Sequence, residues 1–76
     1  MRTSDIYFAS YINALGKPIK SASKVNDAGK VKTVFEFELT AEDEEKFKTD
    51  FFGGTGEVRA LAYMYSLRSL KSMCFA

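Results

Sequence analysis

The clearest pattern in the chain is an alternation of apolar and polar residues that runs from Val31 to Leu39. Alternate residues of a β-strand point to opposite faces, so a period of two predicts a strand with one buried side and one solvent-facing side. The buried side consists of Val31, Thr33, Phe35, Phe37 and Leu39, and the exposed side consists of Lys32, Val34, Glu36 and Glu38. Both phenylalanines of the strand are therefore expected in the core.

The residues before this strand predict a β-hairpin. The sequence Asn26-Asp27-Ala28-Gly29-Lys30 suits a type I turn followed by Gly29 in the left-handed conformation, which makes Asn26 face Lys30. In this register the pairs on the buried face are Val25–Val31, Ser23–Thr33, Ser21–Phe35 and Ile19–Phe37. The pairs on the opposite face are Lys24–Lys32, Ala22–Val34 and Lys20–Glu36. A slip of one residue would bring Phe35 beside lysines, which favours this register over its neighbours.

Apolar residues at spacings of three and four predict three helices around the hairpin. The first covers roughly residues 4 to 15, can be capped by Thr3, Ser4 or Asp5, and ends before Gly16. The second begins at Thr40, which has capping-box spacing to Asp43, and the third runs from about residue 55 into the low seventies. The sequence thus predicts one small α+β domain over residues 1–76. Its expected order is α-β-β-α-α, with a two-stranded antiparallel hairpin packed on three helices.

The last helix is apolar on two sides, which is typical of a helix that is central to its domain or shared with another chain. One side carries Val58, Leu61, Ala62 and Tyr65, and the other carries Ala60, Tyr63, Met64, Leu67, Leu70 and Cys74. A stripe of small residues, Ala62, Ser66, Ser69 and Ser72, suits either an internal helix crossing or a symmetric helix pair. The candidate surface for a dimer or for helix packing consists of Leu61, Ala62, Tyr65 and Ser69.

The hairpin region is strongly basic. Residues 17–32 hold five lysines against one acid, Asp27, although the net charge of the whole chain is only +1. The candidate surface for nucleic acid or another partner consists of Lys20, Lys24, Lys30 and Lys32. An alternative interpretation is a solvated hairpin whose lysines prevent pairing between exposed strand edges. No aromatic residue is expected among these lysines to stack on a base.

The composition argues against catalysis. The chain has no histidine and a single cysteine, Cys74, which excludes an internal disulfide and a cysteine-based zinc site. No nucleophile, base and orienting group come together in the sequence, so we expect no enzyme, no cofactor and no metal site. The glycine-rich segment at residues 53–56 lacks the ending of a phosphate-binding loop and follows a helix. No apolar run reaches the length of a membrane span, and we expect a cytoplasmic protein without membrane contact.

Several short motifs resemble those of a family of small bacterial and phage proteins of unknown function. They are Thr3-Ser4-Asp5 with Tyr7 and Tyr11, Phe35-Glu36-Phe37, Phe51-Phe52-Gly53-Gly54, Arg59-Ala60-Leu61, and the closing Leu67-Arg68-Ser69-Leu70-Lys71-Ser72. This resemblance implies a mobile-element setting, with the host cytoplasm as location, and the same α-β-β-α-α order. It implies no activity and no functional residues.

The sequence is rich in packing signals and holds no catalytic ones. We therefore expect a non-catalytic accessory or interaction protein of phage or mobile-element origin, with a protein partner or a homodimer formed through the last helix. The alternatives are a small nucleic-acid-binding regulator that uses the basic hairpin and an inhibitor that docks on a host protein.

Overall fold

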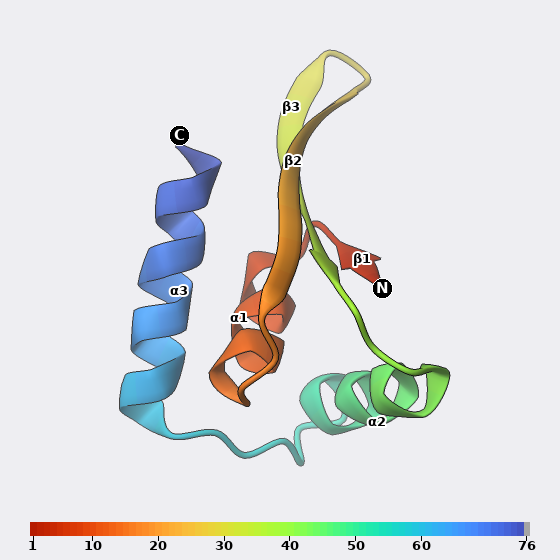
Figure 1. Cartoon of the computed structure of the whole chain (residues 1–76), viewed down its shortest axis with the longest axis vertical. Coiled ribbons are helices and arrows are strands. Elements are labelled where there is room, and N and C mark those ends of the chain that lie inside the picture. Colours follow the sequence, from red (N-terminus) through yellow and green to blue (C-terminus); the bar gives the residue numbers. More distant parts are fainter. Residues whose placement is uncertain (76) are drawn as a thin grey trace.

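The alternating strand predicted from the sequence is the centre of a three-stranded antiparallel sheet (Figure 1). The computed structural model describes residues 1–75. Its elements are β1 (Arg2–Thr3), α1 (Ile6–Ala14), β2 (Ile19–Asp27), β3 (Lys30–Phe37), α2 (Ala41–Phe52) and α3 (Ala60–Cys74). The strands lie in the order β1-β3-β2. The fold is a small α+β domain with the chain order β-α-β-β-α-α.

The predicted two-stranded sheet and α-β-β-α-α order are wrong, because a short first strand pairs with β3. Arg2 pairs with Glu36 and Thr3 pairs with Phe35. The backbone nitrogen of Met1 donates to the Phe37 carbonyl at 2.9 Å, and the Phe37 nitrogen donates to the Met1 carbonyl at 2.8 Å. A strand of two residues is too short to show an alternating pattern, so only its hydrogen bonds reveal it.

The predicted hairpin register is also wrong over most of its length. Asp27 pairs with Lys30, which leaves Ala28 and Gly29 as a two-residue turn. Both turn residues have positive φ, 53° and 83°, as a type I′ turn requires. The prediction placed Ala28 in the right-handed region, because a residue with a β-carbon seldom adopts positive φ.

A bulge at the other end of the hairpin cancels the shift. The pairing slips between Ile19 and Ser21, so Lys20 is the extra residue of β2 and Ile19 pairs with Phe37 as predicted. Between the turn and the bulge, each side chain of β2 therefore lies on the face of the sheet opposite to the predicted one. Val25 now pairs with Lys32, and Lys24 pairs with Thr33.

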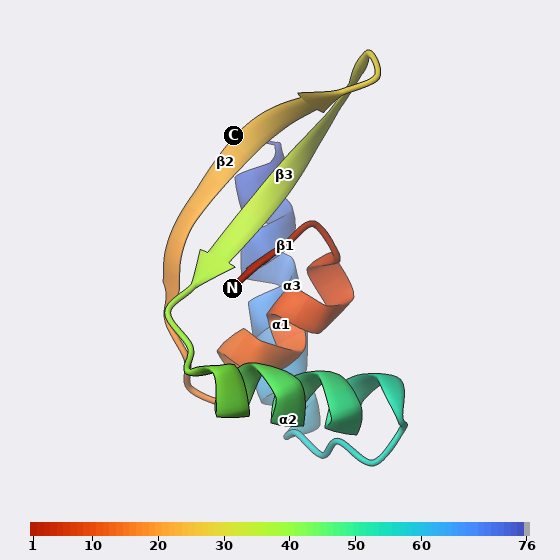
Figure 2. The same cartoon turned by 90° about the vertical axis from the view of Figure 1, so that its right-hand side faces the viewer.

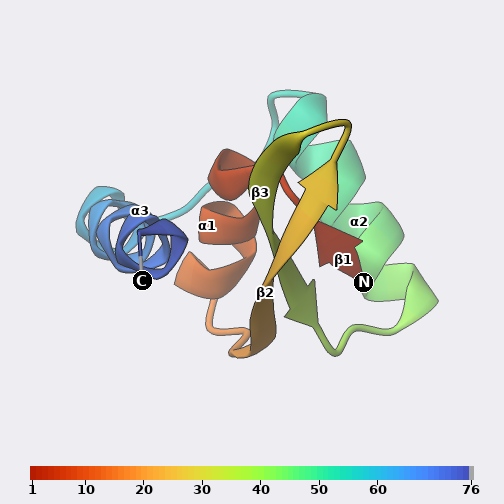
Figure 3. The same ribbon diagram turned by 90° about the horizontal axis from the view of Figure 1, so that it is seen from above.

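The core forms where α1 lies between the sheet and α3 (Figure 3). Its buried apolar residues are Phe8, Ala9, Tyr11, Ile12, Phe35, Phe37 and Leu70. The parity prediction for β3 is confirmed at Thr33, Phe35 and Phe37, which are all buried. It is wrong for Val31, which is 68% exposed because the tip of the hairpin projects past the helices (Figure 1).

The first two helices begin at the polar residues that the sequence suggested. The Asp5 carboxylate accepts hydrogen bonds from the backbone nitrogens of Tyr7 and Phe8, at 3.0 and 3.2 Å. The Thr40 hydroxyl accepts one from the Asp43 nitrogen at 3.1 Å. Such caps satisfy donors that the helix itself leaves unpaired.

Helix α2 runs across the end of the domain opposite the hairpin tip (Figure 2). None of its residues is fully buried. It is held mainly by aromatic contacts, with the ring centroids of Phe51 and Phe52 at 5.4 and 5.1 Å from that of Phe8. The ring of Phe51 also lies 5.2 Å from that of Tyr11.

The two-residue turn predicts that Ala28→Asn stabilises the protein. Asparagine tolerates positive φ better than alanine does, and Asn-Gly is a preferred type I′ sequence. We expect the free energy of unfolding in urea to rise by roughly 0.5–1 kcal/mol. No gain, or a loss, would indicate the three-residue turn, in which residue 28 has negative φ.

Candidate interaction surfaces

Helix α3 turns one of its two apolar sides toward the domain. Ser66 and Leu70 are buried, and Tyr63 and Cys74 pack against the core from partly buried positions. The Tyr63 hydroxyl donates to the backbone carbonyl of Tyr7 on α1 at 3.2 Å. The internal side is therefore the one that carries Leu70.

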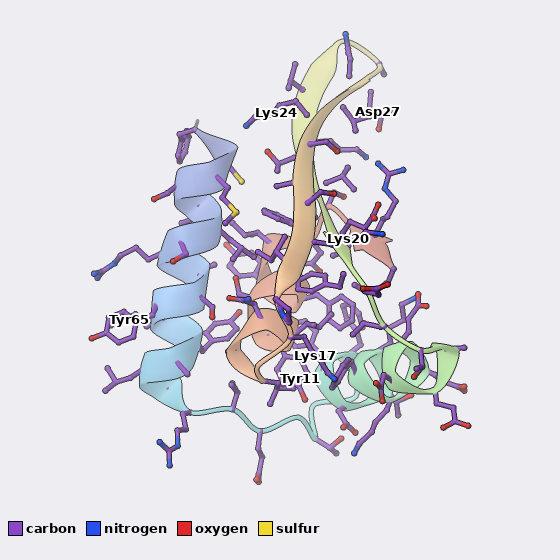
Figure 4. The ribbon with its side chains drawn as sticks, viewed as in Figure 1. Tyr11, Lys17, Lys20, Lys24, Asp27 and Tyr65 are labelled. Atoms are coloured by element: carbon purple, nitrogen blue, oxygen red, sulfur yellow. The ribbon has the colours of Figure 1, made fainter. Side chains whose placement is uncertain are left out.

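The other side of α3 is open to solvent. Leu61 is 64% exposed, Tyr65 is 58% exposed and Met64 is 41% exposed. Figure 4 shows Tyr65 pointing away from the rest of the domain. At 100° per residue, these side chains share a face about 100° wide with Arg68 and Ser72. Phe75, which follows the helix, is 89% exposed. We call Leu61, Met64, Tyr65, Arg68, Ser72 and Phe75 the α3 stripe.

The α3 stripe overlaps only in part with the candidate dimer surface. Leu61, Tyr65 and Ser69 are exposed, whereas Ala62 is partly buried at the edge of the domain. The predicted row of small residues is divided in the same way, since Ser66 is buried and Ser69 and Ser72 are not. Sequence reasoning did not assign Met64 to this surface, because the helical wheel placed it with Leu70, and it attributed the charge of Arg68 to solubility and to the helix dipole.

The surface of α3 is basic as well as apolar. Arg59, Arg68 and Lys71 are all exposed, and the sequence has no aspartate or glutamate from Val58 to Phe75. This absence sets α3 apart from α2, whose first turn alone holds Glu42, Asp43 and Glu44.

The four candidate lysines of the hairpin do not share one face. Lys30 and Lys32 alternate with the buried side chains of β3 and so lie on the outer face of the sheet. Lys20 joins them, because its ammonium lies 3.5 Å from the Glu36 carboxylate on that face. Lys24 pairs with Thr33 and therefore lies on the inner face with the helices. The predicted common face of Lys20, Lys24 and Lys32 is wrong.

Lys24 instead joins the hairpin to the C-terminal end of α3 (Figure 4). Its ammonium donates to the Thr33 hydroxyl at 3.1 Å, to the Met73 carbonyl at 3.5 Å and to the Cys74 carbonyl. The last carbonyls of a helix lack partners within the helix and carry partial negative charge. Lys24 supplies both a donor and a positive charge at this point.

On the outer face, carboxylates partly neutralise the lysines. Lys32 lies 3.1 Å from Asp27, and Glu36 contacts Lys20 and also Arg2, at 3.8 Å. The sequence did not predict Arg2 on this surface, because strand β1, which carries it, was not expected. A phosphate group at this surface would compete with carboxylates that are already in place.

The outer face also holds an open hollow of about 250 Å³. It is lined by Arg2, Thr3, Ser4, Val25, Lys32 and Val34. The lining includes two cations, Arg2 and Lys32, and offers no general base for a proton transfer.

The glycine-rich segment at residues 53–56 serves to end α2. In the glycine-rich segment, the backbone nitrogens of Thr55 and Gly56 both donate to the Asp50 carbonyl, at 2.9 and 2.8 Å. They complete the end of α2 and are not free to hold a phosphate.

No three histidine, cysteine, aspartate or glutamate side chains among residues 1–75 converge on a metal site. Within the same residues, no helix has the length and apolar character needed to cross a membrane.

Comparison with known proteins gives no relative from which a function could be inferred. No family model matches the sequence, and neither a curated protein nor a solved structure matches the chain. Any function must therefore follow from the surfaces themselves.

Lys24→Met is expected to lower the free energy of unfolding by about 1 kcal/mol, because it removes the donor at the C-terminal end of α3. Lys30→Met and Lys32→Met, at exposed positions of the same hairpin, should change it by less than about 0.5 kcal/mol. Urea unfolding of the three variants makes the comparison. Equal losses in all three would contradict the role of Lys24.

The raised pKa of Tyr63 predicts that the folded protein loses stability at alkaline pH. Burial raises the pKa of its hydroxyl, and the nearby Asp5 and Tyr7 raise this pKa further. The folded protein therefore holds the proton more tightly than the unfolded chain does. Its contribution to stability is complete below the unfolded pKa of about 10 and is lost as the pH rises toward the folded pKa.

Urea midpoints measured from about pH 9 to about pH 11 test this effect. Tyr63→Phe should flatten the decline, whereas Tyr65→Phe, at an exposed position, should leave it unchanged. Identical pH profiles for both variants would contradict the assignment.

Proposed function

We propose that this protein is a non-catalytic interaction protein that binds its partner through the α3 stripe. The observation that carries the proposal is the exposure of Leu61, Met64 and Tyr65 along one face of an ordered helix. Scattered exposed apolar residues are ordinary, but a contiguous group of large ones on a small domain is a recognised mark of an interaction surface.

The residue types support this interpretation. Tyrosine, arginine, methionine and phenylalanine are enriched at protein interfaces, and acidic residues and lysine are depleted. The α3 stripe contains Met64, Tyr65, Arg68 and Phe75 and no acid. The helix is also firmly seated, since Leu70 is fully buried and Tyr63 and Lys24 bond it to α1 and to the hairpin. A fixed surface loses little conformational entropy on binding.

The size of the surface suggests a weak or transient complex. A 15-residue helix is about 22 Å long, and one helix face buries less than the roughly 800 Å² per partner of a standard interface. A dissociation constant in the micromolar range is the reasonable expectation.

A nucleic-acid-binding regulator has weaker support. Binding to phosphates would use the hairpin lysines, but Lys24 lies on the other face of the sheet, and Lys20 and Lys32 each contact a carboxylate. An interaction protein is therefore the better-supported function. The phage or mobile-element setting suggested by the motifs remains part of the proposal and concerns the origin of the partner.

A photo-crosslinking amino acid at position 65 tests the proposal in cells. We expect a discrete adduct, because the side chain of Tyr65 lies in the middle of the α3 stripe. The matched control places the same amino acid at Val31, which is 68% exposed but lies on the hairpin. Leu61→Glu in the crosslinking protein should remove the adduct. No adduct at position 65, or the same adducts at both positions, would contradict the proposal.

A further inference from the structure

We infer that the α3 stripe binds an acidic amphipathic helical segment of another protein, and not a second copy of this chain. The inference rests on the proposed function, because it names the chemistry of the partner that the same surface would take. It is carried by the position of Arg68 and by the absence of any acid on α3.

Arg68 lies within the apolar stripe and not at its edge. Met64 and Tyr65 precede it by one turn on the same face, and Phe75 follows about two turns later. Arg59 and Lys71 add positive charge at the start and near the end of the helix. Any partner that covers the stripe must therefore bury or neutralise a guanidinium group at its centre.

A symmetric pair of α3 helices whose two-fold axis passes near Arg68 cannot do this. In a parallel pair, or in an antiparallel pair centred on Arg68, the two copies of Arg68 face each other. The helix offers no carboxylate to compensate in either of these arrangements. Burying a charge without a partner is strongly unfavourable, so the stripe lacks the self-complementarity that a two-fold interface needs.

The acidic helix α2 of a second copy is not a suitable occupant either. Its large apolar side chains Phe47 and Phe51 pack against the core of their own domain, next to Tyr11. It could present its carboxylates, but its one exposed large apolar side chain, Phe52, lies at its last residue against the ring of Phe8 and does not form an apolar face.

An anionic membrane surface fits less well than a protein. Amphipathic helices that lie on membranes keep their cations on the face opposite the apolar one, at the level of the headgroups. The opposite face of α3 is the buried side that carries Leu70, so Arg68 would enter the apolar layer with the stripe.

An acidic amphipathic helix meets all of these requirements. Its apolar residues would pack on Leu61 and Tyr65, and a glutamate or aspartate would accept two hydrogen bonds from the guanidinium of Arg68. Further carboxylates would lie near Arg59 and Lys71. Binding should weaken with added salt, because part of the attraction is between exposed charges.

The experiment uses two synthetic helical peptides of about 20 residues, long enough to form helix in isolation. Both carry leucines at helical spacing, and the other positions are mainly glutamate in one peptide and lysine in the other. Fluorescence anisotropy of the labelled peptides with the full chain measures binding. We expect saturable binding of the glutamate peptide and at least about tenfold weaker binding of the lysine peptide.

Charge reversal at the centre of the stripe is the decisive variant. Arg68→Glu should weaken binding of the glutamate peptide about tenfold or more and strengthen binding of the lysine peptide. The matched control Lys30→Glu makes the same charge change on the hairpin and should leave both affinities unaltered. Circular dichroism of both variants shows that the fold is retained.

Three outcomes would overturn the inference. The first is equal affinity for the two peptides, or affinity that does not depend on residue 68. The second is binding to phosphatidylserine vesicles with no binding of the glutamate peptide. The third is a dimer in sedimentation that Leu61→Glu dissociates. If the crosslink at position 65 persists while the peptide fails, only the partner chemistry is wrong, and loss of that crosslink removes the proposed function itself.

Discussion

The pairing register of β2 and β3 determines which side chains of the hairpin meet the helices. A two-residue turn at Ala28 and Gly29 shifts β2 by one position, and the bulge at Lys20 returns it to register before Phe37. Between these points the inner face carries Lys24 opposite Thr33. Lys24 is solvent-exposed on this face, and its ammonium donates hydrogen bonds to the C-terminal carbonyls of α3. The register of the hairpin therefore determines whether this link to the last helix forms.

Helix α3 is apolar on two sides, but the domain holds only the side that carries Leu70 and Ser66. Leu70 and Ser66 are buried on the side of α3 that packs in the domain, where α3 contacts α1. On α1 the small side chains Ala9 and Ser10 are fully buried, and the hydroxyl of Ser10 has no hydrogen-bond partner among the described residues, which costs free energy. The other side of α3 keeps its large apolar residues in solvent, and the domain itself offers nothing to cover them.

Local signals in the sequence predicted the presence of three helices, the caps of the first two and the burial of Thr33, Phe35 and Phe37, although α3 begins at Ala60 and not near residue 55. Asp5 and Thr40 cap helices because their side chains act on the nearest turn, and Phe35 and Phe37 are buried because alternation is a local property. What was missed depends on contacts that are distant in the chain. Strand β1 exists only through its bonds to β3, and the inward position of Lys24 makes sense only beside Met73 and Cys74. The composition of α3 predicted two apolar faces, but the choice of the internal one required the position of α1.

The weak attachment of α2 gives the domain two levels of local stability. No residue of this helix is fully buried, and its anchor is a few phenylalanine rings that lean on Phe8 and Tyr11. Opening of α2 would break these ring contacts and leave the sheet, α1 and α3 paired as before. Its amide hydrogens should therefore exchange with solvent through a partial opening of low free energy, whereas those of β3 require unfolding of the whole molecule. The sheet, α1 and α3 thus form the stable core, and α2 is the element that opens separately.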